Sequence, residues 1–251
     1  MAGIATGFRR DLREAATHLS TSPFRLPAIV ALFLFAIAQA AISLGPVVGH
    51  PIPFGTDLDI YLAATHRLLA GGSFYPAEQL AHPYQLATGV ILYPPTTIPL
   101  FVVFSVLPRI LWWAIPIGIT ALIVIRWRPR VFGWAIVAVC LSYPNSIGLL
   151  VYGNPAMWAT AAMALATHQR WAAAFVLLKP SLAPLAAFGI RDPRWWLVVS
   201  VPVLASLAVV PLWRDYLVSL TNLRGAGIDY SLGDVPLVVV PLVAWATRRV
   251  R

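Results

Sequence analysis

The longest uncharged stretch of this chain runs from position 131 to position 169 and contains no Asp, Glu, Lys or Arg. A second uncharged stretch, Leu26 to Val48, consists mostly of Ala, Ile, Leu, Val and Phe. About 20 apolar residues in a helix cross the ~30 Å hydrocarbon core of a membrane. Both stretches are long enough, so we expect an integral membrane protein.

The composition excludes the main alternatives. Hydrophobic residues make up 59% of the chain and charged residues only 11%, with a mean hydropathy of +0.78; a soluble domain carries about 25% charged residues. Cys140 is the only cysteine, so an internal disulfide is excluded. All but one of the 18 basic residues are arginines. They are scattered between apolar runs and do not form the stripe typical of nucleic-acid binding, so we expect no nucleic-acid partner.

The apolar runs and the breaks between them predict an all-α fold, a polytopic membrane bundle of about eight spans. The expected spans are Leu26–Val48, Val90–Leu107, Ile110–Ile125, two within 131–169 divided at Tyr143-Pro144-Asn145 and Tyr152-Gly153-Asn154-Pro155, Trp171–Ile190, Trp195–Trp213 and Val235–Thr247. The chain then divides into a cytoplasmic segment 1–25, a first span 26–48, an outer loop 49–92, and a bundle 93–251 with a short cytoplasmic end.

The arginines orient these spans. The first span follows a basic segment, which predicts a multi-pass protein of the plasma membrane with a cytoplasmic N-terminus; this segment contains Arg9, Arg10, Arg13 and Arg25. Alternating sides from there leaves only a weak excess of arginine inside and places Arg126, Arg128 and Arg130 outside. Either an upstream segment is re-entrant or these three arginines have a role outside, and the sequence leaves both possibilities open.

The outer loop is the most polar region of the chain. Apolar residues recur within it at spacings near 3.6, which predicts an amphipathic helix over Asp57–Leu69 lying along the membrane surface. Gly71-Gly72 is expected to end this helix.

A set of short motifs in this loop and downstream has a familiar order. It comprises Asp57, Tyr61, Gly71-Gly72, Tyr75, Tyr93-Pro94-Pro95, Gly153-Asn154 and Lys179-Pro180. This order resembles the polytopic C-type glycosyltransferases, and among them the mannosyltransferases of glycosyltransferase family 87. The resemblance extends over most of the chain, and this chain is a short form compared with the family. It implies transfer of a hexose, with mannose expected, from a polyprenyl-phosphate donor to a lipid or glycan acceptor at the outer face, with inversion and without a cofactor or metal ion.

The resemblance also implies roles for particular residues. Asp57 is the candidate general base, which takes a proton from the acceptor hydroxyl; alternatively, Asp57 only caps the amphipathic helix. The candidate donor-binding residues are Tyr61, Arg67, Tyr93, Asn154 and Lys179. Lys179 lies among apolar residues, where it either binds phosphate or is a snorkelled or paired structural lysine. Asp59 is expected to be solvated, because residues two apart on a helix do not share a face.

A non-catalytic protein is the competing interpretation. In that case the chain is a shortened relative that acts as a membrane scaffold, a subunit or a polyprenyl-lipid-binding protein. A membrane-protein partner that completes the bundle is compatible with either interpretation. Dependence of activity on Asp57 distinguishes them. A secondary transporter is disfavoured because the sequence shows neither inverted repeats nor paired charges within the spans.

Overall fold

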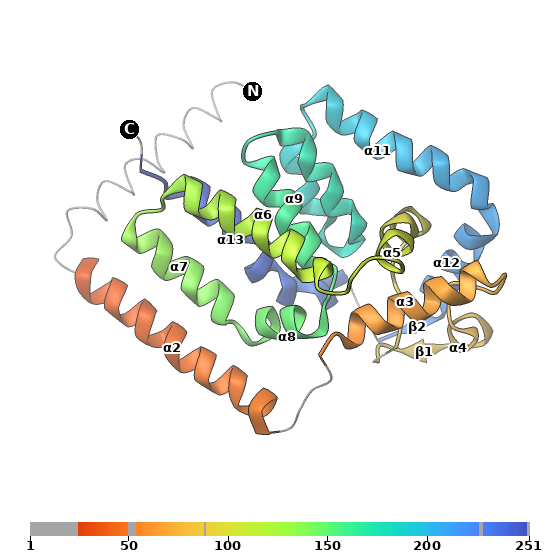
Figure 1. The fold of residues 1–251 in the computed structure, drawn as a ribbon, viewed down its shortest axis with the longest axis horizontal. Helices are drawn as coiled ribbons and strands as arrows, with labels where there is room; N and C mark the ends of the chain where they lie inside the picture. Colours follow the sequence, from red (N-terminus) through yellow and green to blue (C-terminus); the bar gives the residue numbers. More distant parts are fainter. Residues whose placement is uncertain (1–24, 50–53, 88, 226–227, 250–251) are drawn as a thin grey trace.

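The computed structural model describes residues 25–49, 54–87, 89–225 and 228–249, and most of them are helical (Figure 1). In chain order the elements are α2 (Arg25–Gly49), α3 (Thr56–Leu69), α4 (Ala77–Ala81), β1 (Tyr84–Gln85), η1 (Pro95–Thr97), α5 (Ile98–Phe104), α6 (Leu111–Trp127), α7 (Val131–Ser142), α8 (Pro144–Tyr152), α9 (Ala156–Ala166), η2 (Arg170–Leu178), η3 (Pro180–Leu182), α10 (Ala183–Ala186), η4 (Ala187–Gly189), α11 (Pro193–Ser206), η5 (Leu207–Val209), α12 (Val210–Asn222), β2 (Leu223–Arg224), η6 (Ile228–Asp234) and α13 (Val235–Ala246), where η denotes a 3₁₀ helix. β1 and β2 form a two-residue parallel pair. The all-α expectation is confirmed. Of the expected segment 1–25, residues 1–24 lie outside the described residues.

The larger helices run between two ends of the molecule (Figure 1). At one end α6 begins beside the α8–α9 corner, where the Trp112 indole donates to the Gly153 carbonyl at 2.7 Å. At the other end the Trp127 indole, in the last residue of α6, donates to the Thr167 hydroxyl just after α9 at 2.8 Å. We call the end at Gly153 the cavity end. We call the end at Trp127, which lies between Arg126 and Arg128, the basic end. α2 and α7 pack side by side and run in the same direction (Figure 1), and Ser142 donates to the Gln39 side chain at 3.1 Å.

Two helical segments are long and apolar enough to cross a membrane, Leu26–Gly45 and Pro193–Asn222. A third is possible if α7 and α8, which are bent by 62° relative to each other, form one broken span. The remaining apolar helices have 10–17 residues, and 17 residues reach only about 25 Å at 1.5 Å per residue. These helices support a membrane protein, but the expected eight spans are not confirmed.

The expected span Val90–Leu107 does not traverse the molecule. At its start Tyr93 contacts Asn154, and just after its end Arg109 forms an ion pair with Asp59, so it begins and ends at the cavity end. Its helix, α5, has only seven residues. Prolines bracket it on both sides, and a proline within a helix removes a backbone hydrogen bond and clashes with the preceding turn.

The expected span Trp171–Ile190 also folds back on itself. Gly189 packs directly against the backbone of Arg170, which lies at the basic end. Midway between them Lys179 is extended, with φ −120° and ψ 92°. Pro180 follows it, and the residue before a proline is driven out of the helical region. The chain therefore runs from the basic end to Lys179, turns there and returns.

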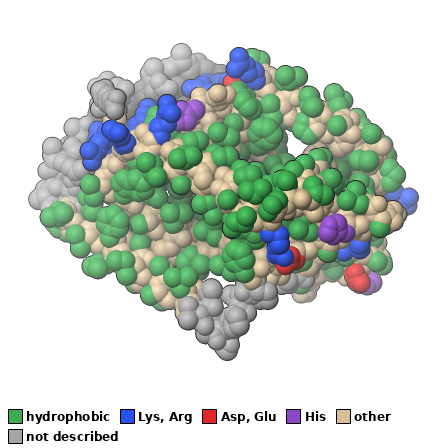
Figure 2. Space-filling view, viewed as in Figure 1, with side chains coloured by type: hydrophobic (Ala, Val, Ile, Leu, Met, Phe, Trp, Pro, Cys, Tyr) green, Lys and Arg blue, Asp and Glu red, His purple; other side chains and the backbone are tan. Residues whose placement is uncertain are grey.

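These reversals change where the arginines lie. The Arg130 N–H donates to the Thr247 carbonyl at 3.0 Å, and Pro129 forms an isolated bridge with Arg248. The sequence analysis placed Arg126, Arg128 and Arg130 on the side opposite to the C-terminus, and that placement is wrong. The upstream segment that fails to cross accounts for the difference. Figure 2 shows Lys and Arg side chains gathered along this edge of the molecule, while hydrophobic side chains cover much of the middle.

The amphipathic helix expected over Asp57–Leu69 is confirmed as α3. It buries Leu58, Tyr61, Ala64 and Thr65, which recur at the three- and four-residue spacing of one helical face. Gly71 follows it with φ +88°, a conformation that glycine adopts at little cost. The buried face of α3 packs on α5, where Tyr61 stacks on Phe101 at 4.8 Å between ring centroids.

Candidate active site

The start of α3 is attached to the end of α8, which positions Asp57. Gly55 is the N-cap of α3, with φ +84° and no side-chain capping bond, and its N–H donates to the Val151 carbonyl at 2.9 Å. Asp57 is the second residue of the helix rather than its cap. Its carboxylate accepts a hydrogen bond from the Asn154 side chain at 2.6 Å, so Asp57 is engaged with another element.

Gly153-Asn154 forms the corner between α8 and α9. Gly153 ends α8 with φ +74°, and a Cβ there would lie 2.8 Å from the Trp113 ring. Glycine suits this corner, because a side chain would be strained at this φ and its Cβ would overlap the indole. The corner turns the Asn154 side chain back toward the start of α3.

The orientation of the Asn154 amide follows from its neighbours. Its oxygen accepts from the Lys179 ammonium at 3.0 Å and from the Ala156 N–H at 3.0 Å, and the Tyr93 hydroxyl donates to it at 3.5 Å. Its nitrogen therefore faces the Asp57 carboxylate, the only arrangement in which every donor meets an acceptor. Asn154 thus joins Asp57 to Lys179.

Lys179 forms a buried ion pair with Asp234. The Lys179 ammonium lies 2.5 Å from an Asp234 carboxylate oxygen, and each side chain is only 7% exposed. The other Asp234 oxygen accepts from the Asn145 amide at 2.9 Å. A buried charge requires such a partner because transfer out of water disfavours an isolated ion strongly. The structure shows Lys179 paired with Asp234, and phosphate binding by Lys179 stays a prediction.

These residues line a cavity of about 360 Å³, which we call the polar cavity. Its polar lining comes from α3, α8, the α8–α9 corner, the turn before η3 and the end of η6: Thr56, Asp57, Asn145, Asn154, Lys179 and Asp234. Tyr61, Tyr93 and Tyr152 also line it, together with aliphatic side chains. Its volume lies in the range of small-molecule sites, which is about 300–1,000 Å³.

The environment of Asp57 favours the protonated form more than water does. Burial raises the pKa of Asp57 above its ordinary value of 3.8, the hydrogen bond from Asn154 and the charge of Lys179 oppose this rise, and the Asp234 carboxylate adds to it. A carboxylate with a raised pKa is a stronger base than one on an open surface. The site therefore suits proton abstraction from a hydroxyl group.

Five of the six predicted site residues meet at this cavity, namely Asp57, Tyr61, Tyr93, Asn154 and Lys179. Arg67 does not line it. Arg67 lies ten residues after Asp57 on α3, about 15 Å along the helix axis, and its guanidinium donates to the Phe74 carbonyl at 3.2 Å. Arg67 is a predicted donor-binding residue, and the structure places it away from the cavity that the other five predicted residues line.

Asp59 lies outside the cavity, as the helical spacing predicted. Its carboxylate pairs with Arg109 at 2.8 Å, with both side chains about half exposed. Within the described residues, no group of three or more His, Cys, Asp or Glu side chains converges, so no candidate metal site is assigned.

Asp234 and Asn145 line the polar cavity but were not predicted from the sequence. Asp234 stands directly before the last apolar run, and a charge at the border of such a run could have suggested a partner for Lys179. Asn145 was considered only as part of the break between two expected spans. No local signal connects these two positions to each other, because they lie on different helices.

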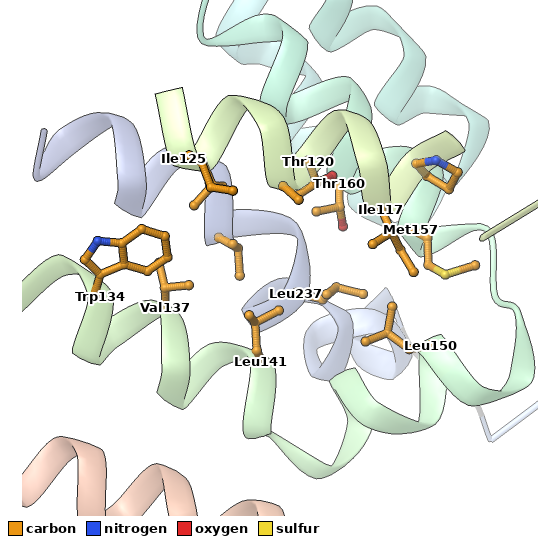
Figure 3. Close-up of a pocket in the computed structure, with 14 residues that line it drawn as sticks. Ile117, Thr120, Ile125, Trp134, Val137, Leu141, Leu150, Met157, Thr160 and Leu237 are labelled. Atoms are coloured by element: carbon orange, nitrogen blue, oxygen red, sulfur yellow. The ribbon is translucent and has the colours of Figure 1, made fainter. Parts of the chain in front are cut away.

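A second cavity, which we call the apolar cavity, adjoins the α8–α9 corner (Figure 3). It has a volume of about 380 Å³ and lies between α6, α7, α8, α9 and α13. Its lining is almost entirely apolar, and Leu150 and Met157 close the end next to the corner. Leu149 lines the polar cavity and Leu150 the apolar one, so the two cavities lie on either side of this corner.

Comparisons of the chain with protein-family models, with curated proteins and with solved structures give no match in any of the three. The resemblance to family 87 therefore rests on the motifs quoted from the sequence.

Proposed function

We propose that this protein is a membrane glycosyltransferase that transfers a hexose, with mannose as the expected sugar, from a polyprenyl-phosphate donor to a lipid or glycan acceptor. The observation that carries the proposal is the meeting of Asp57, Asn154 and Lys179 in one cavity. These residues come from three distant segments of the chain, and all three belong to the motif set of the sequence.

The proposed reaction is a single displacement with Asp57 as the base. The acceptor hydroxyl lies beside the Asp57 carboxylate, which takes its proton as the acceptor oxygen bonds to the anomeric carbon. The bond from that carbon to the phosphate oxygen breaks on the opposite side, and its electron pair leaves with the phosphate. A phosphate leaving group needs no proton, so one carboxylate suffices, and the anomeric centre is inverted.

The charges of the cavity indicate where the donor phosphate binds. Lys179 is the one cation among the described residues that line the polar cavity, so its ammonium is the proposed partner of the phosphate. Carboxylate, amide and tyrosine groups suit the hydroxyl groups of a sugar instead. We therefore place the sugar within the polar cavity and the phosphate beside Lys179, where it competes with Asp234 for the ammonium.

The apolar cavity supports an amphiphilic donor. Isoprenoid chains are purely hydrocarbon, and they gain free energy in proportion to the apolar area that they bury. A cavity with an aliphatic lining lies just across the α8–α9 corner from the proposed sugar site (Figure 3). A donor with a polar head and an apolar tail matches this pair of cavities.

The proposed orientation places the polar cavity at the outer face of the plasma membrane and the N-terminus in the cytoplasm. Arg126 and Glu78 lie toward opposite ends of the molecule, the first at the end of α6 and the second on α4. In a Cys140→Ser background, Glu78→Cys should react with a membrane-impermeant maleimide in intact cells and Arg126→Cys only after permeabilisation. The reverse pattern would invert the orientation.

The test of the function is transfer of label from radiolabelled polyprenyl-phospho-mannose in membranes. Asp57→Asn should lower the transfer rate at least 100-fold, the usual minimum for losing a general base. Asp59→Asn is the matched control, because it removes the same charge two residues away outside the cavity. Equal loss in both variants, or full activity of Asp57→Asn, contradicts the assignment of the base.

The competing function is a non-catalytic polyprenyl-lipid-binding protein, a scaffold or a subunit that needs a membrane partner. The apolar cavity favours the lipid-binding version, since it can hold an isoprenoid chain without chemistry at Asp57. In that case wild type and Asp57→Asn both retain donor binding, and neither transfers label. The Lys179–Asp234 pair also removes one argument against a transporter, which relied on the absence of paired buried charges. Label transfer that depends on Asp57 separates an enzyme from all of these.

A further inference from the structure

The basic end carries a cluster of arginines that the proposed reaction does not use. We call it the arginine patch, and it consists of Arg126, Arg128, Arg130, Arg248 and Arg249. Two segments bring these residues together, since the Arg130 N–H donates to the Thr247 carbonyl and the Arg249 N–H to the Arg128 carbonyl. Arg128 adopts φ +46°, the only positive φ at a described residue other than glycine. The patch is therefore held in one arrangement by its backbone.

The described part of the chain does not neutralise this charge. The only described acidic residue at the basic end is Asp192, which caps α11 by accepting from the Arg194 N–H at 3.0 Å. The C-termini of α6 and α13 carry about half a negative charge each. They explain Arg126 in the last turn of α6 and Arg248, whose guanidinium donates to the Trp245 carbonyl at 2.5 Å. Five guanidinium groups exceed these two partial charges several-fold.

One member of the patch stands where the helix dipole disfavours it. Arg130 is the N-cap of α7 and makes no capping hydrogen bond through its side chain. The N-terminus of a helix carries a partial positive charge, so it attracts anions and repels a guanidinium. An external anion next to Arg130 would relieve this repulsion and interact with the exposed N-terminus of α7.

Tryptophan side chains surround part of the patch, an arrangement typical of a membrane–water interface. The Arg248 guanidinium carbon lies 5.4 Å from the centroid of the Trp127 ring and 4.8 Å from that of Trp245, and the Trp127 ring stacks on His168 at 4.5 Å. Tryptophan collects at membrane–water interfaces, and basic residues next to membrane helices attract anionic lipids. α2, the first helix of membrane-crossing length, begins at this same end, since its later residues pack beside the end of α7.

We infer that the arginine patch binds the phosphate groups of anionic phospholipids in the membrane leaflet opposite to the polar cavity. The charge, the N-terminus of α7 and the interfacial tryptophans all fit a negatively charged head group at the surface of a bilayer. This inference does not depend on the proposed transferase activity.

The test uses the full chain purified in a neutral detergent, with bound lipids counted by native mass spectrometry in equal mixtures of phosphatidylglycerol and phosphatidylcholine. Wild type should bind phosphatidylglycerol in preference to phosphatidylcholine. The triple variant Arg126→Gln/Arg128→Gln/Arg130→Gln should bind phosphatidylglycerol on the order of 100-fold more weakly, given the typical attraction of each arginine to an anionic surface.

The matched control removes three exposed arginines elsewhere, through Arg67→Gln/Arg214→Gln/Arg224→Gln, and should keep the preference. Equal loss in both triple variants would show a general charge effect and overturn the inference. Displacement of the lipid by inorganic phosphate at equal concentration would also overturn it, because the site would then bind free anions. If the patch variant does not fold, the salt dependence of the wild-type protein tests the inference. Binding of phosphatidylglycerol to wild type should weaken as the salt concentration rises from 50 to 500 mM. Binding that salt leaves unchanged overturns the inference.

Discussion

Lys179→Met should lower the free energy of unfolding by about 3 kcal/mol, because it leaves the Asp234 carboxylate buried without its counter-ion. Removing one partner of a buried ion pair costs about 3–5 kcal/mol, and both side chains here are 7% exposed. Asp234 keeps the hydrogen bond from Asn145 at 2.9 Å, so we expect the lower end of that range. In a chain of this size each kcal/mol lowers the Tm by about 2–4 °C, so the Tm should fall by about 6–12 °C.

A second substitution should recover much of this loss. In Lys179→Met/Asp234→Asn the buried negative charge is gone, and the new amide oxygen still accepts from Asn145. The double variant should lie within about 1–2 kcal/mol of wild type, because replacing both partners of a buried pair is often close to neutral. Activity should not recover with stability, since the ammonium that meets the Asn154 amide is still absent.

Thermal unfolding in detergent, followed by near-ultraviolet circular dichroism, measures these differences. The exposed pair between Asp59 and Arg109 provides the control, and Arg109→Met should cost no more than about 1 kcal/mol because water screens that pair. If Lys179→Met costs as little as Arg109→Met, or if Lys179→Met and Asp234→Asn are additive in the double variant, the buried pair does not have the energetic role that its geometry indicates.

Three further changes test the site. Transfer needs the deprotonated form of Asp57, so the transfer rate should rise as the pH passes the raised pKa of this residue. Asn154→Ala removes a hydrogen bond that lowers the pKa of Asp57, so this rise should occur at a higher pH than in wild type. Gly153→Ala places a Cβ 2.8 Å from the Trp113 indole at a φ of +74°. The change should lower the free energy of unfolding by about 1–2 kcal/mol, measured through the Tm. It should also lower turnover on the order of 100-fold, because it displaces Asn154. Ala121→Phe fills part of the apolar cavity. KM should therefore rise roughly tenfold for a long-chain donor and stay unchanged for a donor with two isoprene units. Ala114→Phe, on the same helix, is the control and should leave the KM of both donors unchanged.

Several features of this protein follow from its sequence alone. The uncharged stretches predict membrane helices, the spacing of apolar residues predicts α3, and Gly71 marks its end. These features depend on neighbours within a few residues, because helix formation and its termination are decided by local periodicity and backbone freedom. The motif order also selected five of the residues that line the polar cavity.

The tertiary structure alone decided which apolar segments traverse the molecule and which charges meet. Val90–Leu107 and Trp171–Ile190 are apolar enough to suggest spans, yet both fold back, because prolines interrupt their helices and other helices cover them. Asp234 pairs with Lys179, and only the packing of the helices brings these two distant residues together. Hydropathy measures only how well a segment tolerates an apolar environment, and protein packing supplies that environment as well as lipid does. Long-range pairing of charges depends on how the helices pack, which no local pattern contains.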